Sequence, residues 1–208
     1  CRASDMQLPH GRVELPVFMP VGTKGSLKGL TSEELSGLGC RLFLGNTYHL
    51  HNDPGADFLA ARGGLRAFIG WPHNVLTDSG GFQMVSLSKL CTVSEEGVRF
   101  RHPTTDREMF LRPEDSVRAQ TGIGADIIMA LDDVVSSTLT GERVAEACDR
   151  TLRWVRRCLA AHANAERQSL FPIVQGGLDE QLRAQCLHDM QELPARGFAI
   201  GGLSGGER

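Results

Sequence analysis

The sequence has no excess of basic residues, no long hydrophobic run and no low-complexity segment. Its 22 Lys and Arg are balanced by 25 Asp and Glu, which gives a formal net charge of −3. This balance excludes a broadly basic coat for nucleic acid, because the release of phosphate counterions needs a basic surface. A local basic face is compatible with it. No run approaches the roughly 18 apolar residues of a membrane-spanning helix, and no signal-peptide pattern opens the chain.

Metal-binding cysteine motifs are also missing. The six cysteines form no C-x-x-C pair and no Cys/His cluster with the spacing of a zinc site. We interpret them as free thiols in a reducing cytosol. No metal site is therefore predicted within these residues.

Glycine is abundant, with 24 residues among 208, but it follows no period, so we expect it to serve turns. The length is sufficient to bury a core without disulfides or metals. The chain begins at Cys1 rather than Met and ends in GGLSGGER. We therefore expect it to be part of a longer protein.

Short apolar runs, each followed by small or polar residues, recur along the chain. They are continuous rather than alternating, which favours strands buried on both faces, as in parallel sheets. The predicted strands are residues 17–21, 42–44, 75–76, 127–131, 171–174 and 198–200.

Helix patterns lie between these strands. Residues 31–34 read as a capping box, with Leu30 and Leu35 placed as a hydrophobic staple. Pro113 suits the first position of a helix and Gly122 its end. An apolar stripe predicts a further helix, whose other side is covered by charged residues at 146–157. The stripe consists of Val144, Cys148, Leu152, Val155 and Leu159.

Another helix is expected around Leu182, Cys186 and Met190, and a hairpin from residues 98–102 and 107–111. Strand, polar loop and helix, repeated about six times, predict an α/β fold of the TIM-type (β/α)8 class. We expect an incomplete barrel over residues 1–208, with about six of eight strands and a hairpin insertion. A doubly wound open sheet is the alternative.

In a barrel, the carboxyl ends of the strands meet at one mouth. That mouth would hold carboxylates, a primary amide and glycine N–H groups, which together complement a guanine-like edge. It offers no Ser/His/Asp triad, and GGLSGG is only a weak phosphate-binding candidate. The residues concerned are Asn46, Thr47, Asp78, Ser79, Asp132, Asp133, Gln175 and the backbone of 201–203.

Each candidate also has a structural interpretation. An Asp after a strand often caps a helix, but Asp78 is followed by SGGFQ, which favours function. Of Asp132 and Asp133, we expect one to be functional and one structural. Gln175 and Asn46 leave both interpretations open. The arginines at 150–157 suit a solvated helix face, with a phosphate contact as the alternative.

Several long motifs occur in order over nearly the whole chain. They are PVFMPVGT, GNTYHL, GWPHNVLTDSGGFQMVSL, SEEGVRF, GADIIMALDDVVSS, FPIVQGG and GFAIGGLSGGE. Together they resemble the tRNA-guanine transglycosylases, and DDVVSS resembles the eukaryotic catalytic subunits, the queuine tRNA-ribosyltransferases. The resemblance implies a TIM-type barrel that replaces guanine at the tRNA wobble position with queuine. It also implies a covalent tRNA–aspartate intermediate in queuosine biosynthesis.

The resemblance assigns roles to matching residues. Asp78 corresponds to the proton-handling aspartate, with Asn46 and Thr47 orienting it. Asp132 corresponds to the residue that grips the base's N1–H and amine, and Gln175 to a donor to the base carbonyl. The remaining matches line the base pocket or contact the base: Ser79, Gly80, Gly81, Phe82 as a stacking lid, the N–H of Gly202, and the carbonyl of Leu203 toward the aminomethyl group.

Val134 corresponds to a specificity position, where bacterial members carry Cys and take a smaller precursor. The resemblance places the nucleophilic Asp and a Cys3His zinc site beyond residue 208, so this chain alone is expected to be inactive. No organic cofactor is implied.

The implied partners are the tRNA anticodon loop, guanine, queuine and an accessory subunit in a heterodimer. The resemblance implies a cytoplasmic protein and leaves peripheral association with the mitochondrial outer membrane open. Two alternatives are a non-catalytic accessory subunit of the same enzyme and a barrel enzyme for a phosphorylated small molecule. The candidate base pocket argues against the first, and the lack of basic residues near GGLSGG argues against the second.

Overall fold

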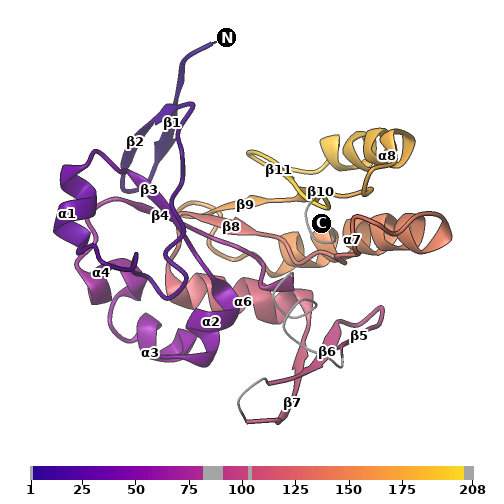
Figure 1. The fold of residues 1–208 in the computed structure, drawn as a ribbon, viewed down its shortest axis with the longest axis horizontal. Helices are drawn as coiled ribbons and strands as arrows, with labels where there is room; N and C mark the ends of the chain where they lie inside the picture. Colours follow the sequence, from indigo (N-terminus) through magenta and orange to yellow (C-terminus); the bar gives the residue numbers. More distant parts are fainter. Residues whose placement is uncertain (1, 82–90, 103–104, 204–208) are drawn as a thin grey trace. The chain divides into compact units, whose positions relative to one another are not determined.

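The computed structural model describes residues 2–81, 91–102 and 105–203 (Figure 1). The chain forms two compact units. The first contains Cys1–Asp78, Arg118–Ile128 and Asn164–Ser169. The second contains Ser79–Val117, Met129–Ala163 and Leu170–Arg208.

The first unit contains an antiparallel hairpin, two parallel strands and four short helices. Strand β3 pairs with β4 in parallel, and β4 pairs with β8. The capping box is confirmed, because Thr31 and Glu34 each accept the other's backbone N–H. The elements are β1 (Ser4–Leu8), β2 (Gly11–Leu15), α1 (Ser32–Gly37), β3 (Leu42–Gly45), α2 (Thr47–Asn52), α3 (Ala56–Ala60), α4 (Gly64–Ile69) and β4 (Asn74–Thr77).

The hairpin of β1 and β2 has no counterpart among the predicted elements. Its turn is attached to the sheet by polar contacts. Asn74 Nδ2 donates to the Gly11 carbonyl at 3.1 Å, and the His10 N–H donates to Asn74 Oδ1 at 3.1 Å. His10 Nδ1 lies 2.5 Å from Asp126 Oδ1, and Asp126 Oδ2 accepts the Val75 N–H at 2.8 Å. Burial raises the pKa of Asp126 despite these contacts.

The predicted strand at residues 17–21 is wrong as a regular buried strand. Val21 alone forms an isolated bridge, to Leu44 of β3, and Phe18 is 85% exposed. Pro20 contributes its carbonyl to the Leu44 N–H but has no N–H to give to a ladder. The segment therefore follows β3 with only partial pairing.

The second unit contains an antiparallel sheet of order β5-β6-β7 and a parallel pair of β10 and β11. The predicted hairpin is confirmed as β6 and β7, with β5 as an additional strand. The elements are β5 (Cys91–Val93), β6 (Val98–Arg101), β7 (Glu108–Leu111), α7 (Glu142–Ala161), β10 (Ile173–Val174), α8 (Glu180–Gln191) and β11 (Ala199–Ile200).

Three elements begin in one unit and end in the other: α6 (Pro113–Ile123), β8 (Ile127–Met129) and β9 (Ser169–Phe171). Helix α6 begins at Pro113 as predicted, but it continues through Gly122 to Ile123. A Cβ at Gly122 would lie 3.0 Å from the Ala56 carbonyl, so close packing rather than helix termination explains this glycine.

The predicted strand at residues 171–174 is two strands, β9 and β10, which belong to different sheets. Pro172 separates them, because proline cannot donate to a ladder. Strand β8 ends at Met129, two residues before the predicted end.

A mixed α/β fold with a parallel sheet of order β3-β4-β8-β9 is thus confirmed. The described residues form no closed barrel, so the barrel stays a prediction. None of the helices in the described ranges is both long and apolar enough to cross a membrane.

Candidate functional site

Asp78 lies in the first unit, directly after β4. Strands β3 and β4 are parallel and in register at Gly45 and Thr77, so the residues that follow them share one sheet edge. Asn46 Nδ2 donates to Asp78 Oδ2 at 2.7 Å, and the Thr47 N–H donates to Asp78 Oδ1 at 2.9 Å. Thr47 Oγ1 also donates to the Asp78 carbonyl at 2.5 Å. The structure therefore brings this predicted trio together.

The same Asn46 side chain caps α2, where its Oδ1 accepts the His49 N–H at 3.3 Å. The Asn46 amide is thus bound to the helix through its oxygen and to the Asp78 carboxylate through its nitrogen. Asp78 is half-buried, so its carboxylate is oriented by uncharged donors and still borders solvent.

Asp132 lies in the second unit and is only 5% exposed. Ser79 Oγ donates to Oδ1 at 3.0 Å, and Gln175 Nε2 donates to Oδ2 at 2.6 Å. Burial raises the pKa of Asp132 to about 6, while the hydrogen bonds from Ser79 and Gln175 lower it. The group is a desolvated carboxylate that is paired with neutral donors.

Two glycines allow close approach to this group. A Cβ at Gly81 would lie 3.2 Å from Asp132 Oδ1, and one at Gly202 would lie 2.3 Å from Gln175 Oε1. Gly202 also has a φ of +71°, in the left-handed region that favours glycine. Any side chain at these positions would occupy the space beside the Asp132 and Gln175 polar atoms.

Asp133 has different surroundings, although it is the next residue. Its side chain is fully buried, and both carboxylate oxygens accept from arginines of α7. Arg143 Nη2 lies 2.7 Å from Oδ1 and Arg150 Nη1 lies 2.5 Å from Oδ2. The Asp133 N–H donates to Thr151 Oγ1 at 3.0 Å. The structure thus gives the two aspartates different surroundings, with Asp133 in an ion-pair network, and the functional role of either one stays a prediction.

The prediction that Arg150 belongs to a solvated face is wrong, because this residue is 8% exposed. Val144, Cys148 and Val155 are buried as predicted, but Leu152 and Leu159 are only half-buried. The buried face also includes a second stripe, which contains the two arginines that bind Asp133 and is buried except for the half-buried Arg143. It runs through Arg143, Ala147, Arg150 and Trp154, spaced by four, three and four residues.

That helical spacing was the signal available in the sequence, since positions i, i+4, i+7 and i+11 share one face. Sequence reasoning missed it because arginine is rarely buried unless it is paired. The other arginines of α7 lie at the surface or partly buried. Arg153 binds Glu95 at 2.7 and 2.8 Å, and Arg157 binds Glu114 at 2.7 and 2.9 Å.

The other predicted site residues are not joined to these two groups by the described hydrogen bonds. Gly80 is buried with a φ of +82°. Val134 is half-buried, and Leu203 is 46% exposed. Phe82 lies outside the described residues. The roles assigned to these residues stay predictions.

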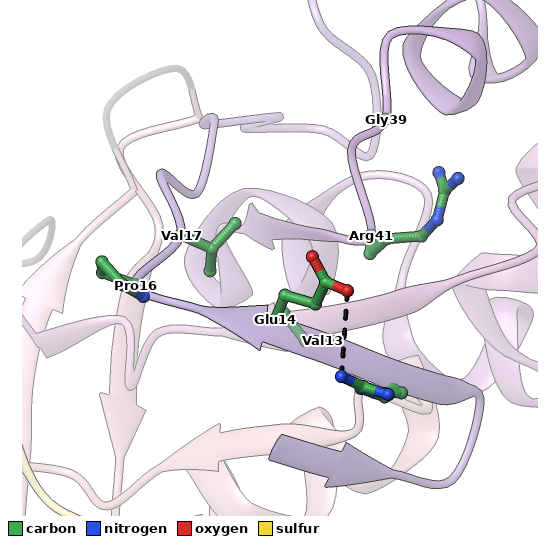
Figure 2. A pocket seen from close by; sticks show the side chains of 7 residues that line it. Val13, Glu14, Pro16, Val17, Gly39 and Arg41 are labelled. Carbon is green, nitrogen blue, oxygen red and sulfur yellow. Dashed lines mark ion pairs between the residues drawn. The ribbon is translucent and has the colours of Figure 1, made fainter. Parts of the chain in front are cut away.

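A pocket of about 460 Å³ lies in the first unit and contains none of the predicted site residues. Figure 2 shows Glu14 and Arg41 beside it, with the dashed line marking the 3.8 Å ion pair of Glu14 with Arg12. A second pocket, of about 230 Å³, lies in the second unit. Its lining includes Val144, Gly176 and Leu178.

Across the ranges that the structure describes, no three His, Cys, Asp or Glu side chains are grouped closely enough to hold a metal ion. The zinc site that the resemblance implies stays a prediction for segments beyond residue 208.

Comparison with known proteins gives consistent similarities. A family model described as queuine tRNA-ribosyltransferase matches residues 1–208. The chain is 53% identical over 206 residues to the queuine tRNA-ribosyltransferase catalytic subunit of Schizosaccharomyces pombe, covering 99% of this chain and 51% of that protein. The Caenorhabditis elegans catalytic subunit is 51% identical, with the same coverage. The queuine tRNA-ribosyltransferase of Staphylococcus aureus is 47% identical, covering 100% and 56%. The chain thus spans about half the length of these curated relatives.

Proposed function

Because this chain belongs to the queuine tRNA-ribosyltransferase family, we propose that it forms the base-recognition part of a tRNA-guanine transglycosylase. The resemblance noted in the sequence is confirmed at the level of the family. The proposed reaction replaces guanine at the wobble position with queuine, in queuosine biosynthesis. The observation that carries it is the buried Asp132 carboxylate between Ser79 and Gln175.

An ionised carboxylate has about four lone-pair sites, and Ser79 and Gln175 use two of them. The remaining sites suit the N1–H and exocyclic amine of guanine, which are adjacent donors. The Gln175 amide has two N–H donors, so it can keep one on Asp132 and give the other to the base carbonyl. We propose that the Gly202 N–H adds a second donor and that the Leu203 carbonyl meets the queuine aminomethyl group.

Asp78 is proposed as the proton acceptor, with Asn46 and Thr47 as its orienting partners. In this proposal an Asp from a later segment attacks C1′ of the nucleotide. Guanine leaves with the electron pair of the C1′–N9 bond and takes up a proton from water. Queuine then loses its N9 proton to Asp78 and bonds to C1′, which releases the attacking Asp. A base is extruded more readily from a single-stranded anticodon loop than from a duplex.

The later segments of the full-length protein are proposed to close the TIM-type barrel and to supply the nucleophile and the zinc ligands. A heterodimer with an accessory subunit, a cytoplasmic location and peripheral contact with the mitochondrial outer membrane are proposals of the same kind. Relatives named as catalytic subunits at 53% and 51% identity support the catalytic interpretation over the accessory one. Family membership sets aside the barrel enzyme for phosphorylated small molecules.

Asp132→Asn in the full-length protein tests the proposal. An amide places a donor where the base needs an acceptor, so guanine and queuine should each bind about a hundredfold more weakly. Isothermal titration with each free base measures this. Asp149→Asn is the matched control, because Asp149 is an exposed carboxylate of α7. Unchanged affinity of Asp132→Asn for both bases would contradict the role of Asp132.

The chain of 208 residues alone is expected to form no covalent adduct with tRNA, because the proposed nucleophile lies in a later segment. Denaturing gel electrophoresis after incubation with tRNA measures this. The full-length protein is the positive control. A denaturant-resistant adduct of residues 1–208 would show that the nucleophile is among them.

A further inference from the structure

Asp133 links Asp132, the proposed base-recognition carboxylate, to helix α7. Three of its atoms are fixed by that one helix: two carboxylate oxygens by Arg143 and Arg150, and the backbone nitrogen by Thr151. The peptide unit between Asp132 and Asp133 is planar, so a constraint on the Asp133 N–H also constrains the carbonyl end of Asp132. The direction of the Asp132 side chain therefore depends on contacts that Asp132 does not make itself.

Arg150 is the more strongly constrained of the two arginines. Its side chain is 10% exposed, whereas that of Arg143 is 35% exposed. Arg150 Nη2 also binds Glu146 at 2.5 Å, and its Nε lies 3.6 Å from Glu95 Oε2. A planar guanidinium held on several sides is preorganised, so it can fix the carboxylate that it binds.

We infer that Arg150 is a positioning residue for base recognition, which holds Asp133 in place and offsets its negative charge beside Asp132. The inference rests on the proposed function, because it concerns the same base site. Arg150 itself touches neither the base nor the reacting atoms. It acts through Asp133 on the direction and the ionisation of the Asp132 carboxylate.

Electrostatics give this inference a distinct signature. The Asp133 charge raises the pKa of Asp132, so removing a cation from Asp133 should raise it further. Among the described residues, the thiols of Cys158 in α7 and Cys91 in β5 also interact electrostatically with Asp132 and Asp133, respectively. Burial raises the pKa of Cys158 to about 12 and also raises that of Cys91, so both thiols stay neutral near pH 7.

The test measures guanine binding to the full-length protein by titration calorimetry between about pH 5 and 8, the range around the Asp132 pKa. Arg150→Met removes the charge and keeps much of the stem. It should weaken binding about tenfold at pH 7 and move the midpoint of the binding–pH curve upward. Arg153→Met is the matched control, since Arg153 lies on the same helix and binds Glu95 rather than Asp133. It should change neither quantity.

Two further variants keep the test decisive if Arg150→Met folds poorly. Arg150→Lys keeps the charge, so its midpoint should match the parent's even where its affinity is lower. Arg150→Met combined with Asp133→Asn removes both charges, so its midpoint should return toward that of the parent. Melting temperatures of all variants report the folded fraction.

Parallel loss of affinity at every pH in Arg150→Met, with no midpoint shift, would overturn the inference and leave a purely structural role. So would a full midpoint shift in Arg153→Met. Failure of the proposed function looks different, because the parent protein would then bind no guanine, or Asp132→Asn would bind it normally.

Discussion

Asp132 and Asp133 are neighbours in the chain and both are buried, yet their surroundings differ in kind. Asp132 is bonded to a hydroxyl and an amide, and burial raises its pKa to about 6. Asp133 is bonded to two guanidinium groups. A carboxylate with only neutral donors stays costly to ionise and can still accept from a ligand. One that is paired with two cations is already satisfied. The difference supports the proposal that Asp132 serves base binding, whereas Asp133 serves the fold.

Asp133→Asn should give the largest effect on stability. It leaves Arg143 and Arg150 facing a neutral amide in a buried site, and breaking a buried ion pair costs about 3–5 kcal/mol. Urea unfolding of the full-length protein at pH 7 measures the loss. Asp149→Asn, at an exposed position of the same unit, is the control. A loss no larger than that of the control would remove the contrast between the two aspartates.

Asp132→Asn should stabilise the protein at neutral pH relative to its effect at acid pH, whereas Asp133→Asn destabilises it at pH 7. The folded pKa of about 6 lies above the unfolded value, so ionisation opposes folding. The stabilising contribution of Asp132 is complete below about pH 4 and is lost as the pH rises through about 6. This loss is about 3 kcal/mol for a shift of two pKa units, and Asn avoids it.

Urea unfolding of parent and variant at several pH values between about 4 and 7 measures the difference. The free energy of unfolding of Asp132→Asn should gain on that of the parent as the pH rises. If the variant instead lost stability relative to the parent as the pH rises, the pKa of Asp132 would be lowered rather than raised.

Gly202→Ala should weaken guanine binding by a smaller amount, about 2 kcal/mol or roughly thirtyfold. The added methyl would lie 2.3 Å from Gln175 Oε1, and φ is unfavourable for alanine, so the amide must move away from Asp132. Calorimetry with guanine measures it. Gly39→Ala is a control for backbone strain alone, because Gly39 also has positive φ but no atom within 4 Å of a Cβ. Equal effects on guanine binding would contradict the steric argument.

Val134→Cys should give the smallest effect, about tenfold in the ratio of kcat/KM for queuine over the smaller precursor, moved toward the precursor. Val134 is half-buried and lies two residues after Asp132. A branched, stiff side chain without an S–H group presents a different wall from that of cysteine. Exchange rates with both bases decide it. No shift, or one toward queuine, would show that specificity is set elsewhere.

Much of the candidate site could be predicted because chemistry at strand ends is visible in the sequence. Asp78 and Asp132 each follow an apolar run, and the parallel pairing of β3 with β4 brings Asn46 and Asp78 to one edge. The pairing of Asn46 with Asp78 also agrees with the resemblance. Arg150 could not be predicted in the same way, because its burial depends on a carboxylate 17 residues away.

The fold shows the same limits. Continuous apolar runs predicted β3 and β4, where packing on both faces decides the structure. The prediction of one strand at residues 171–174 is wrong, because Pro172 has no N–H to donate to a neighbouring strand and interrupts the apolar run. The hairpin of β1 and β2 was not predicted, because the residues that hold its turn are distant in the sequence. His10 in the turn binds Asn74 and Asp126.

The way the β5–β6 turn attaches to α7 bears on how the sequence can change during evolution. Trp154 Nε1 and Arg157 Nη1 both donate to the Glu95 carbonyl, and Arg157 Nη2 donates to the Glu96 carbonyl. Carbonyls are present in every amino acid, so these bonds do not depend on the side chains of the turn. The Arg153–Glu95 side-chain pair is exposed and contributes little. Substitutions at residues 95 and 96 would therefore leave these backbone bonds in place, whereas substitutions at Trp154 and Arg157 would remove them.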